Sequence, residues 1–270
     1  MKNKIKILAY HNVLPDDGTS GIKDTVKLST FKSHMETIKI GDWQVVPLIQ
    51  IINALNNGLE LPKKAVVITF DDGYKGVLSY AAPVLNKCKY PATIFLSTAY
   101  IGTEKIFPWL PRNPNVEYNQ SYTALNWEEL RVLQESHFTI GSHFHTHQFL
   151  PTLNSIEIEK EIKISKKIIS DNLGCEINVF SFPYSFPFKH TLWPEFKEKI
   201  IDMLVLNGVV GSCTLERKNI TCKTNPYFLP RIPLFKNDIK PLFAIKLETN
   251  PLHLNFAQNF HQKYLKYRGI

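Results

Sequence analysis

Two adjacent aspartates, Asp71 and Asp72, follow the apolar run 65–70 (AVVITF) and precede Gly73. A run so rich in β-branched residues is typical of a strand buried on both faces of a parallel sheet. Two carboxylates at the end of a buried strand are costly unless a cation or strong hydrogen bonds compensate them. Asp-Asp-Gly is also an ordinary turn sequence, so this motif alone leaves both a cation site and a simple turn open.

Three histidines, His143, His145 and His147, stand close together directly after the expected strand 138–140. His143 and His147 can converge on one ion if the segment is helical or tightly turned, whereas an extended segment places all three on one face. Two imidazoles and one carboxylate leave coordination positions open for water and substrate, which indicates catalysis. A lone histidine is usually structural, but this cluster, together with the paired aspartates, favours a divalent metal.

Strands alternate with helices along the chain, which predicts parallel βα units in an α/β barrel or a doubly wound sheet. Ser29 is the expected N-cap of the first helix, and Asn126 with Glu129 has the spacing of a capping box. Gly58 and Gly174 are expected to end two further helices. In a barrel, chemistry gathers where strands end, and the polar clusters follow such ends. The expected strands are 6–10, 65–70, 92–96, 138–140 and 177–182, and the expected helices are 28–40, 46–59, 74–86, 127–136 and 155–173.

The composition is that of an ordinary globular protein. Of 270 residues, 44% are hydrophobic and 21% are charged, which provides enough apolar material for one large core. No Gly/Ser-rich, Pro-rich or single-charge linker interrupts the chain, so we expect residues 1–270 to form one domain. The net charge of +8 comes from lysines spread over the whole chain, and no basic arm or aromatic-basic repeat indicates nucleic-acid binding.

The N-terminal sequence MKNKIKILAYHNV contains Lys2, Lys4 and Lys6, and its apolar run is too short for the core of a signal peptide. No stretch approaches the length of a membrane span, so we expect a cytoplasmic protein without a transmembrane segment. The cysteines form no C-x-x-C pair. Reduced thiols are the simplest interpretation, and a disulfide between Cys213 and Cys222 is the alternative.

Six short segments carry a joint pattern: 69–73 (TFDDG), 143–147 within GSHFHTH, 182–184 (FPY), 10–13 (YHNV), 91–95 (PATIF) and 228–233 (FLPRIP). Together they resemble the motifs of the polysaccharide deacetylase family, carbohydrate esterase family four. The resemblance is closest to the subgroup that contains the bacterial poly-N-acetylglucosamine deacetylases, in which the motif order is permuted. It implies a distorted (β/α)7-type barrel of the α/β class with a metal at its mouth, and a motif-bearing core from about Ile7 to Leu234.

The resemblance implies a metal and a general base. Asp72, His143 and His147 would be the ligands of one divalent metal, with zinc expected and other divalent transition metals as alternatives. Asp71 would be the general base for the attacking water, whose pKa the metal lowers. His145 points away from the ligand pair in the family pattern and is not expected to be a ligand.

The same resemblance assigns the remaining catalytic functions. The backbone N–H of Tyr184, next to Pro183 in the substrate loop, would stabilise the oxyanion together with the metal. His11 would protonate the departing amine, because imidazole can donate a proton near neutral pH; taken by itself, it reads as a structural histidine behind a strand. Arg231 would orient Asp71, since an unpaired guanidinium in the apolar context LPRI is costly; a pairing with a surface carboxylate is the alternative.

Two positions depart from the family pattern, and one long segment has two interpretations. Ser185 stands where a glycine commonly follows Pro-Tyr, and Ser181 stands where some relatives carry arginine. These changes alter the loop beside the substrate but not the metal site. The segment 101–123 is rich in Pro, Asn and aromatic residues, and loops of this length are usually functional or disordered. Its Trp109 and Tyr118 either stack on a sugar ring or plug the end of the barrel.

The residues predict a metal-dependent enzyme, and the resemblance implies a hydrolase that removes an N-acetyl group from an amino sugar during synthesis of a surface polysaccharide. Because no signal peptide is expected, the expected partner is an N-acetylated precursor that is nucleotide- or lipid-linked. An N-deformylase or an O-acetyl esterase with the same metal site is the nearest alternative. A catalytically inactive carbohydrate-binding relative is a second alternative, which the intact Asp71, Asp72, His143 and His147 disfavour.

Overall fold

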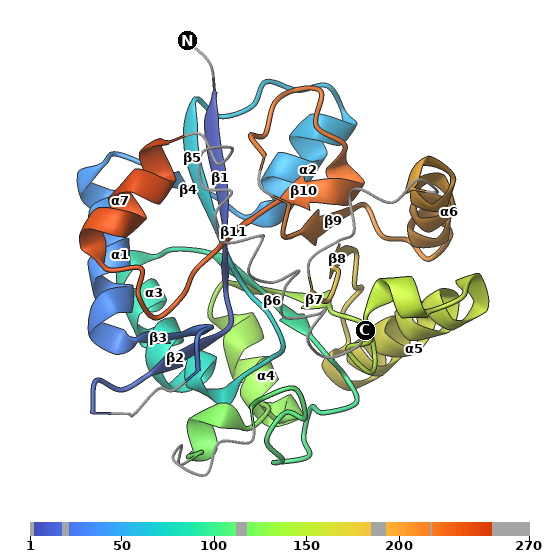
Figure 1. Cartoon of the computed structure of the whole chain (residues 1–270), viewed down its shortest axis with the longest axis horizontal. Helices are drawn as coiled ribbons and strands as arrows, with labels where there is room; N and C mark the ends of the chain where they lie inside the picture. Colours follow the sequence, from blue (N-terminus) through green and yellow to red (C-terminus); the bar gives the residue numbers. More distant parts are fainter. Residues whose placement is uncertain (1–2, 18–21, 112–117, 185–192, 217, 250–270) are drawn as a thin grey trace.

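Parallel strands form the centre of the molecule, and helices surround them (Figure 1). The computed structural model describes residues 3–17, 22–111, 118–184, 193–216 and 218–249. Over these residues, no helix is both long and apolar enough to cross a membrane. The strands of the main sheet are β1 (Lys4–Tyr10), β4 (Gln44–Val45), β5 (Lys64–Phe70), β6 (Ala92–Leu96), β7 (Phe138–Ser142), β8 (Val179–Ser181), β9 (Gly211–Thr214), β10 (Leu229–Pro230) and β11 (Ile232–Pro233). The helices are α1 (Leu28–Ile40), α2 (Leu48–Asn56), α3 (Ala82–Cys88), α4 (Trp127–Glu135), α5 (Ser155–Leu173), α6 (Trp193–Leu206) and α7 (Lys240–Glu248), and a separate two-stranded sheet pairs β2 (Asn12–Leu14) with β3 (Thr25–Lys27).

The main sheet closes into a barrel through one short segment, 229–233. Its first half, β10, pairs in parallel with β9 at Leu229 and Cys213, and its second half, β11, pairs in parallel with β1 at Ile232 and Leu8. The strand order β9-β8-β7-β6-β5-β1 between them is parallel throughout. When the closing segment counts once, seven of the described strands surround the axis, and the expected (β/α)7-type barrel of the α/β class is confirmed.

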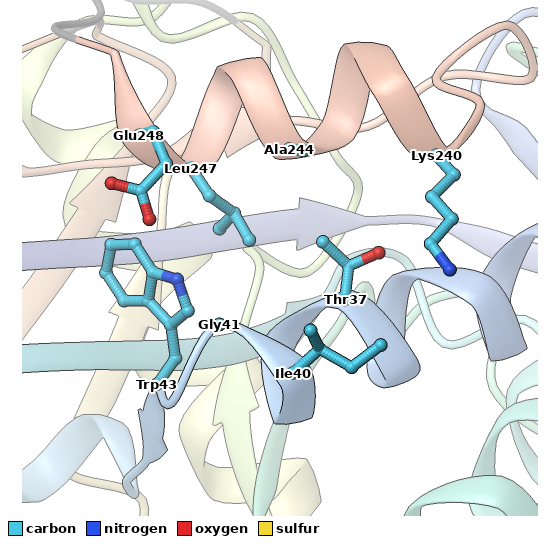
Figure 2. A pocket seen from close by; sticks show the side chains of 8 residues that line it. All are labelled: Thr37, Ile40, Gly41, Trp43, Lys240, Ala244, Leu247 and Glu248. Carbon is cyan, nitrogen blue, oxygen red and sulfur yellow. The ribbon is translucent and has the colours of Figure 1, made fainter.

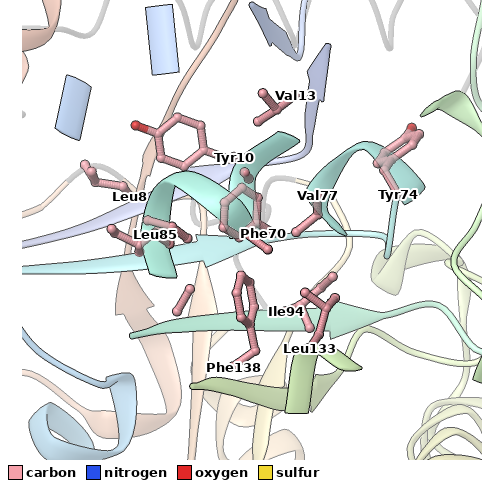
Figure 3. Close-up of a cluster of buried hydrophobic side chains, with 14 of the residues drawn as sticks. Leu8, Tyr10, Val13, Phe70, Tyr74, Val77, Leu85, Ile94, Leu133 and Phe138 are labelled. Atoms are coloured by element: carbon pink, nitrogen blue, oxygen red, sulfur yellow. The ribbon is translucent and has the colours of Figure 1, made fainter. Parts of the chain in front are cut away.

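The two-residue period of the strands separates an inner from an outer apolar layer. On β5, Ala65 and Val67 belong to one cluster with side chains of β1, β9, β10 and α2. Ile68 and Phe70 belong to a second cluster with side chains of α1, α3 and α4, and Figure 3 shows Phe70 within it. Both layers are buried, which accounts for the uninterrupted apolar run of this strand. The inner face of β5 continues to Asp71, so the strand delivers this carboxylate to the opening of the barrel.

Local signals account for several helix boundaries. α4 and α5 begin with capping boxes at Asn126 and Asn154, and α5 ends at Gly174 with a φ of +64°. The expected N-cap at Ser29 is wrong. The backbone N–H of Ser29 bonds instead to Oδ1 of Asp16, so a side chain from a preceding loop satisfies this donor at the start of α1.

Proline explains two differences from the expected helices. The helix expected from residue 46, α2, begins only at Leu48, because the residue before Pro47 avoids the helical conformation. Within the expected helix 74–86, Val77–Ala81 forms a π-helical turn ahead of α3, next to Pro83, which has no N–H to donate to the preceding turn. The sequence pattern does not predict β9, β10, β11, α6 or α7.

A groove lies between α1 and α7 (Figure 2). Its volume is about 170 Å³, and the side chains of Trp43, Ile40 and Glu248 are part of its wall. Glu248 forms ion pairs with Lys4 and Lys64 at the amino ends of β1 and β5. The groove therefore lies toward the end of the barrel opposite the carboxyl ends of the strands.

Candidate active site

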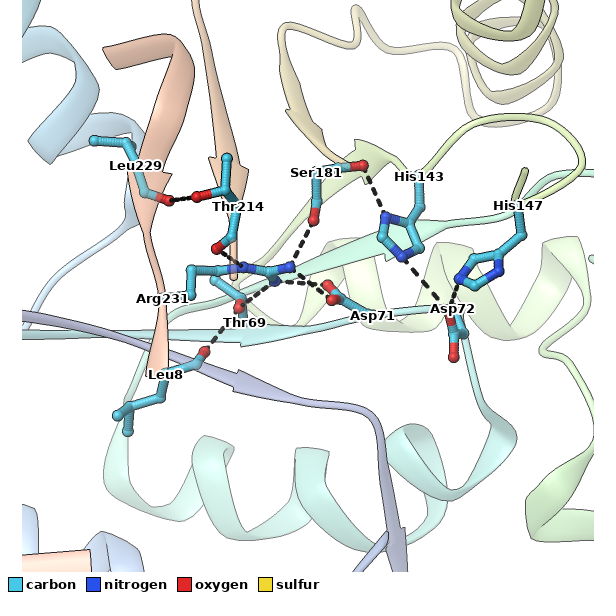
Figure 4. Close-up of polar contacts among 10 residues, drawn as sticks. All are labelled: Leu8, Thr69, Asp71, Asp72, His143, His147, Ser181, Thr214, Leu229 and Arg231. Atoms are coloured by element: carbon cyan, nitrogen blue, oxygen red, sulfur yellow. Dashed lines mark hydrogen bonds and ion pairs between the residues drawn. The ribbon is translucent and has the colours of Figure 1, made fainter. Parts of the chain in front are cut away.

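The carboxyl ends of neighbouring strands bring the expected motif residues together (Figure 4). Asp71 and Asp72 follow β5, His143 and His147 follow β7, and Arg231 lies between β10 and β11. None of these residues is more than 8% exposed. Charged groups buried to this degree need compensation, and the site residues form two linked parts that differ in how they obtain it.

The first part is a set of three side chains that face one point. Oδ1 of Asp72 lies 3.6 Å from Nε2 of His143 and 3.2 Å from Nε2 of His147. Donor atoms of the three residues lie within 4.8 Å of one another, a spacing that suits ligation of a single ion. Oδ1 of Asp72 is buried and has no hydrogen-bond partner among the residues that the structure describes. Because a divalent cation would satisfy this otherwise costly oxygen, the three residues fit a metal.

Hydrogen bonding fixes which nitrogen of His143 faces the carboxylate. Nδ1 of His143 lies 2.8 Å from the backbone oxygen of Ser181, and a carbonyl oxygen only accepts, so Nδ1 carries the proton. The unprotonated Nε2 then points at Asp72, as a metal ligand requires. Burial lowers the pKa of His143 to about 4, although the charge of Asp71 opposes this effect, and the ring is neutral at physiological pH.

Asp72 is ionised despite its burial. Burial opposes ionisation, but His147, His11 and His143 together hold the pKa of Asp72 well below its ordinary value. The second carboxylate oxygen, Oδ2, accepts a hydrogen bond of 3.3 Å from the indole N–H of Trp109. Asp72 therefore presents one oxygen to His143 and His147 and the other to the loop that contains Trp109.

The second part is the ion pair between Arg231 and Asp71. Nη1 and Nη2 of Arg231 donate to Oδ1 and Oδ2 of Asp71, each over 2.7 Å. The other N–H groups donate to Oγ1 of Thr69 (3.0 Å), Oγ of Ser181 (2.7 Å) and the backbone oxygen of Thr214 (3.3 Å), so every guanidinium donor is used. Burial opposes ionisation of Asp71, but the charge of Arg231 holds its pKa below the ordinary value. Arg231 thus pairs with Asp71 rather than with a surface carboxylate.

Ser181 joins the two parts, and the sequence motifs do not identify it as a site residue. Its backbone oxygen accepts from His143, and its buried hydroxyl accepts from Arg231. Through Arg231, Ser181 is connected to Asp71. The sequence marks Ser181 only as a departure from the family pattern beside the substrate loop. The structure places it instead at the end of β8, in contact with His143 and Arg231.

His11 lies at the same opening, directly after β1. It is half-buried, and its charge influences the pKa of both Asp71 and Asp72. Its Nδ1 is buried and has no hydrogen-bond partner within the described part of the chain. The structure therefore places a titratable group with an unused nitrogen beside the two aspartates.

The loop after β8 brings Tyr184 against the histidines. The ring of Tyr184 packs edge-on against His147, with centroids 4.7 Å apart, and Pro183 is buried beside it. Tyr184, His147 and Asp72 have φ angles of +59°, +57° and +75°. Left-handed backbone costs on the order of 1 kcal/mol for a residue with a Cβ atom, and such residues gather at functional sites. Ser185 lies outside the described residues.

The histidine segment is a tight turn anchored by α5, not an extended strand. The backbone N–H and the hydroxyl of Thr146 donate to Oε2 (2.7 Å) and Oε1 (2.6 Å) of Glu161. His145 faces elsewhere, because its Nδ1 bonds to Oγ1 of Thr98 over 2.9 Å. The anchor at Thr146 holds the backbone directly before His147, and sequence reasoning does not identify Glu161.

Trp109 packs within the site. Its ring stacks on His147, with centroids 4.0 Å apart and an interplanar angle of 17°. Tyr118 instead packs edge-on against Tyr122 and donates its hydroxyl to the backbone oxygen of Pro111. Of the two aromatic residues that the sequence singles out in this loop, Trp109 is the one that contacts the proposed metal ligands.

Comparison with known proteins agrees with the motifs. The polysaccharide deacetylase family model matches residues 58–203. The poly-beta-1,6-N-acetyl-D-glucosamine N-deacetylase of Staphylococcus epidermidis is 27% identical over 254 residues, which cover 88% of this chain and 81% of that protein. The protein of the same name from Staphylococcus aureus is 25% identical over 208 residues, which cover 77% of this chain and 67% of that protein.

Two solved structures share the fold. The deacetylase PplD of Streptococcus pyogenes has a TM-score of 0.73 and 17% identity, and the match covers 92% of this chain and all of that one. IcaB from Ammonifex degensii has a TM-score of 0.71 and 20% identity, over 92% of this chain and 98% of that one. At these identities the likeness concerns the fold alone. Because the family model spans more than half of the sequence, the expected resemblance is confirmed, and the chain belongs to the polysaccharide deacetylase family.

Proposed function

We propose that the protein is a metal-dependent hydrolase that removes an N-acetyl group from an amino sugar. One observation carries the proposal: the buried Oδ1 of Asp72, which lacks a hydrogen-bond partner among the described residues, faces Nε2 of both His143 and His147. Three protein ligands leave coordination positions open, which is typical of catalytic rather than structural metals. The family membership and the names of the two staphylococcal relatives support the same chemistry.

Asp71 would act as the general base. The neighbouring triad would hold one divalent metal, with zinc expected and other transition metals as alternatives. When bound, the metal would acidify the attacking water and polarise the amide carbonyl. Asp71 is held ionised by Arg231, so it is ready to take the proton of that water. Because both of its oxygens are anchored by the guanidinium, the carboxylate keeps one orientation.

Two further groups would complete the hydrolysis. The backbone N–H of Tyr184 would donate to the developing oxyanion. Tyr184 has a φ of +59°, which changes the direction of the backbone after β8. His11 would give a proton to the amine nitrogen as the C–N bond breaks, which releases acetate and the free amino sugar. Pro183 would shape the wall of the substrate loop.

A polymer of N-acetylglucosamine is the first substrate to test, because both staphylococcal relatives are named for poly-beta-1,6-N-acetyl-D-glucosamine. A nucleotide- or lipid-linked precursor and a cytoplasmic location stay predictions. Parallel assays on the polymer and on nucleotide-linked N-acetyl sugars, together with cell fractionation, distinguish a polymer substrate from a cytoplasmic precursor. Activity on the polymer alone, with the protein outside the cytoplasm, would contradict the precursor hypothesis.

The central experiment compares the wild-type protein with Asp72→Ala and Asp71→Asn. We expect about one divalent metal per chain in the wild type and in Asp71→Asn. We expect the metal to be lost in Asp72→Ala, because Asp72, unlike Asp71, would be one of its three ligands. Acetate release from N-acetylglucosamine oligomers should disappear in Asp72→Ala and fall at least about a hundredfold in Asp71→Asn. Asp171→Asn, on the exposed face of α5, is the control. Undiminished acetate release by metal-free protein would refute the proposal.

The same assay separates the alternatives. A protein that holds the metal and releases formate but not acetate from N-acylated sugars would be a deformylase. Release of acetate only from O-acetylated sugars would indicate an esterase. Binding of oligomers without release of any acid would identify a carbohydrate-binding relative.

A further inference from the structure

We propose that Trp109 is a positioning residue that restricts Asp72 to one metal-binding oxygen and fixes the ring of His147. The inference rests on the metal site of the proposed function. The indole N–H of Trp109 lies 3.3 Å from Oδ2 of Asp72, and its ring stacks on His147 at 4.0 Å. One side chain thus contacts two of the three proposed ligands.

The hydrogen bond distinguishes the two oxygens of Asp72. Oδ2 accepts from Trp109, whereas Oδ1 has no partner among the described residues and faces both imidazoles. The indole N–H is only a donor, so it stabilises Oδ2 as an acceptor and opposes rotation of that oxygen toward a cation. A carboxylate that binds through one oxygen occupies one coordination position instead of two. The position that remains is available to water or to the substrate carbonyl.

The two ligand histidines are oriented by different means. A histidine ligand usually donates its second ring N–H to a fixed acceptor, and His143 does so through Nδ1 to the backbone oxygen of Ser181. Nδ1 of His147 is buried, and no described residue hydrogen-bonds to it. Two aromatic rings hold the imidazole of His147 instead: Trp109 stacks on it, and Tyr184 packs against it edge-on. Within the described ranges, aromatic packing takes the place of that hydrogen bond at His147.

Trp109 is itself held by aromatic neighbours. The ring of Phe107 lies nearly parallel to it at 4.7 Å, and the ring of Tyr100 meets it edge-on at 4.9 Å. Phe107 in turn packs edge-on against Tyr74 at 4.5 Å. An indole packed on several sides has a fixed rotamer, which a positioning residue requires and which opposes a swing toward a sugar ring.

Two substitutions separate the contributions of the indole. Trp109→Phe keeps an aromatic ring on His147 but removes the hydrogen bond to Asp72, and Trp109→Leu removes both. Trp43→Phe, in the groove between α1 and α7, is the matched control at the other end of the barrel. Zinc affinity is measured by competition with a chromophoric chelator, and coordination is followed through the absorption spectrum of the cobalt(II)-loaded protein. Thermal unfolding of each metal-free variant checks that it folds.

We expect zinc affinity to fall about tenfold in Trp109→Phe and about a hundredfold in Trp109→Leu, and to stay unchanged in Trp43→Phe. The cobalt bands of Trp109→Phe should weaken, because the released Oδ2 raises the coordination number. Unchanged zinc affinity or an unchanged cobalt spectrum in Trp109→Phe would overturn the inference while the metal site stands. A wild-type protein that binds neither zinc nor cobalt would overturn the proposed function together with this inference.

Discussion

The guanidinium of Arg231 and the carboxylate of Asp71 meet through two parallel hydrogen bonds of 2.7 Å each, at the junction of β10 and β11. Each residue is only 1% exposed. The segment that closes the barrel therefore also supplies the cation that keeps the proposed base ionised. One short segment thus both closes the barrel and brings a cation to Asp71.

Arg231→Lys is expected to move the acid limb of the pH–rate profile to higher pH. Lysine keeps the charge but cannot form the two parallel hydrogen bonds. The charge of Arg231 lowers the pKa of Asp71 against the opposing effect of burial, so a weaker interaction raises that pKa. Asp71 would then be protonated, and lost as a base, at a higher pH during acidification. We also expect a loss of stability on the order of 2 kcal/mol, because several buried acceptors lose their donor.

The profile of kcat/KM from about pH 4 to about pH 8 tests this expectation. Arg131→Lys is the control, because Arg131 pairs with Glu128 on the exposed face of α4. If the Arg231→Lys profile coincides with that of the wild type, the guanidinium does not set the ionisation of Asp71.

His11→Gln is expected to lower kcat for N-acetylglucosamine oligomers about a hundredfold or more, with unchanged metal content. Glutamine cannot give a proton to the departing amine. The leaving group of 4-nitrophenyl acetate needs no protonation, so the same variant should lose little activity toward this ester. Steady-state kinetics on both substrates measure the difference. Equal losses on the amide and the ester would rule out His11 as the general acid.

Glu161→Gln is expected to weaken the anchor of the histidine turn. Both carboxylate oxygens of Glu161 accept from Thr146, and glutamine would present an NH₂ group to one of these donors. We expect a destabilisation of about 1–3 kcal/mol and a weaker zinc affinity, because His147 directly follows Thr146. Urea unfolding and chelator competition measure the two effects. Glu159→Gln, which affects only an exposed pair with Lys163 on the same helix, should change neither.

The sequence predicts the long buried strands of the barrel but not its closure. β5 and β6 are continuous apolar runs, so their pattern alone identifies them. The closing strands have two residues each, contain Pro230 and Pro233, and are separated by Arg231. Such a segment has no strand propensity of its own. It forms because β9 and β1 offer it partners on both sides, which is a property of the assembled barrel.

The site likewise contains residues whose positions depend on the assembled barrel and not on a local sequence pattern. Asp71, Asp72 and the histidines stand out because their residue types and strand-end positions are informative together. Ser181 and Glu161 are residue types that are common on any surface, and their roles arise from contacts between distant segments. The bond from Arg231 to Thr69 spans 162 residues of sequence. Only the register of the folded strands brings such groups within hydrogen-bond distance.

A buried histidine on α1 predicts how stability depends on pH. Nε2 of His34 bonds to the backbone oxygen of Asp238, which only accepts, so Nε2 carries the proton and Nδ1 accepts from the hydroxyl of Tyr10 over 2.9 Å. The ring also stacks on Phe243 of α7 at 3.9 Å. Protonation of Nδ1 would break the bond with Tyr10. Burial lowers the pKa of His34 to about 4, although Asp238 opposes this effect.

The direction of the pH effect follows from this lowered pKa. Between the ordinary value of 6.5 and about 4, the unfolded chain binds a proton at His34 that the folded chain does not bind. The stability that neutral His34 contributes is therefore complete above 6.5 and is lost as the pH falls toward 4. The difference corresponds to roughly 3 kcal/mol at most. His34→Gln removes the titration, so its free energy of unfolding should be lower near neutral pH yet vary less with acidification. Urea unfolding at several pH values across this window measures both curves, and parallel curves would show that His34 is not the group responsible.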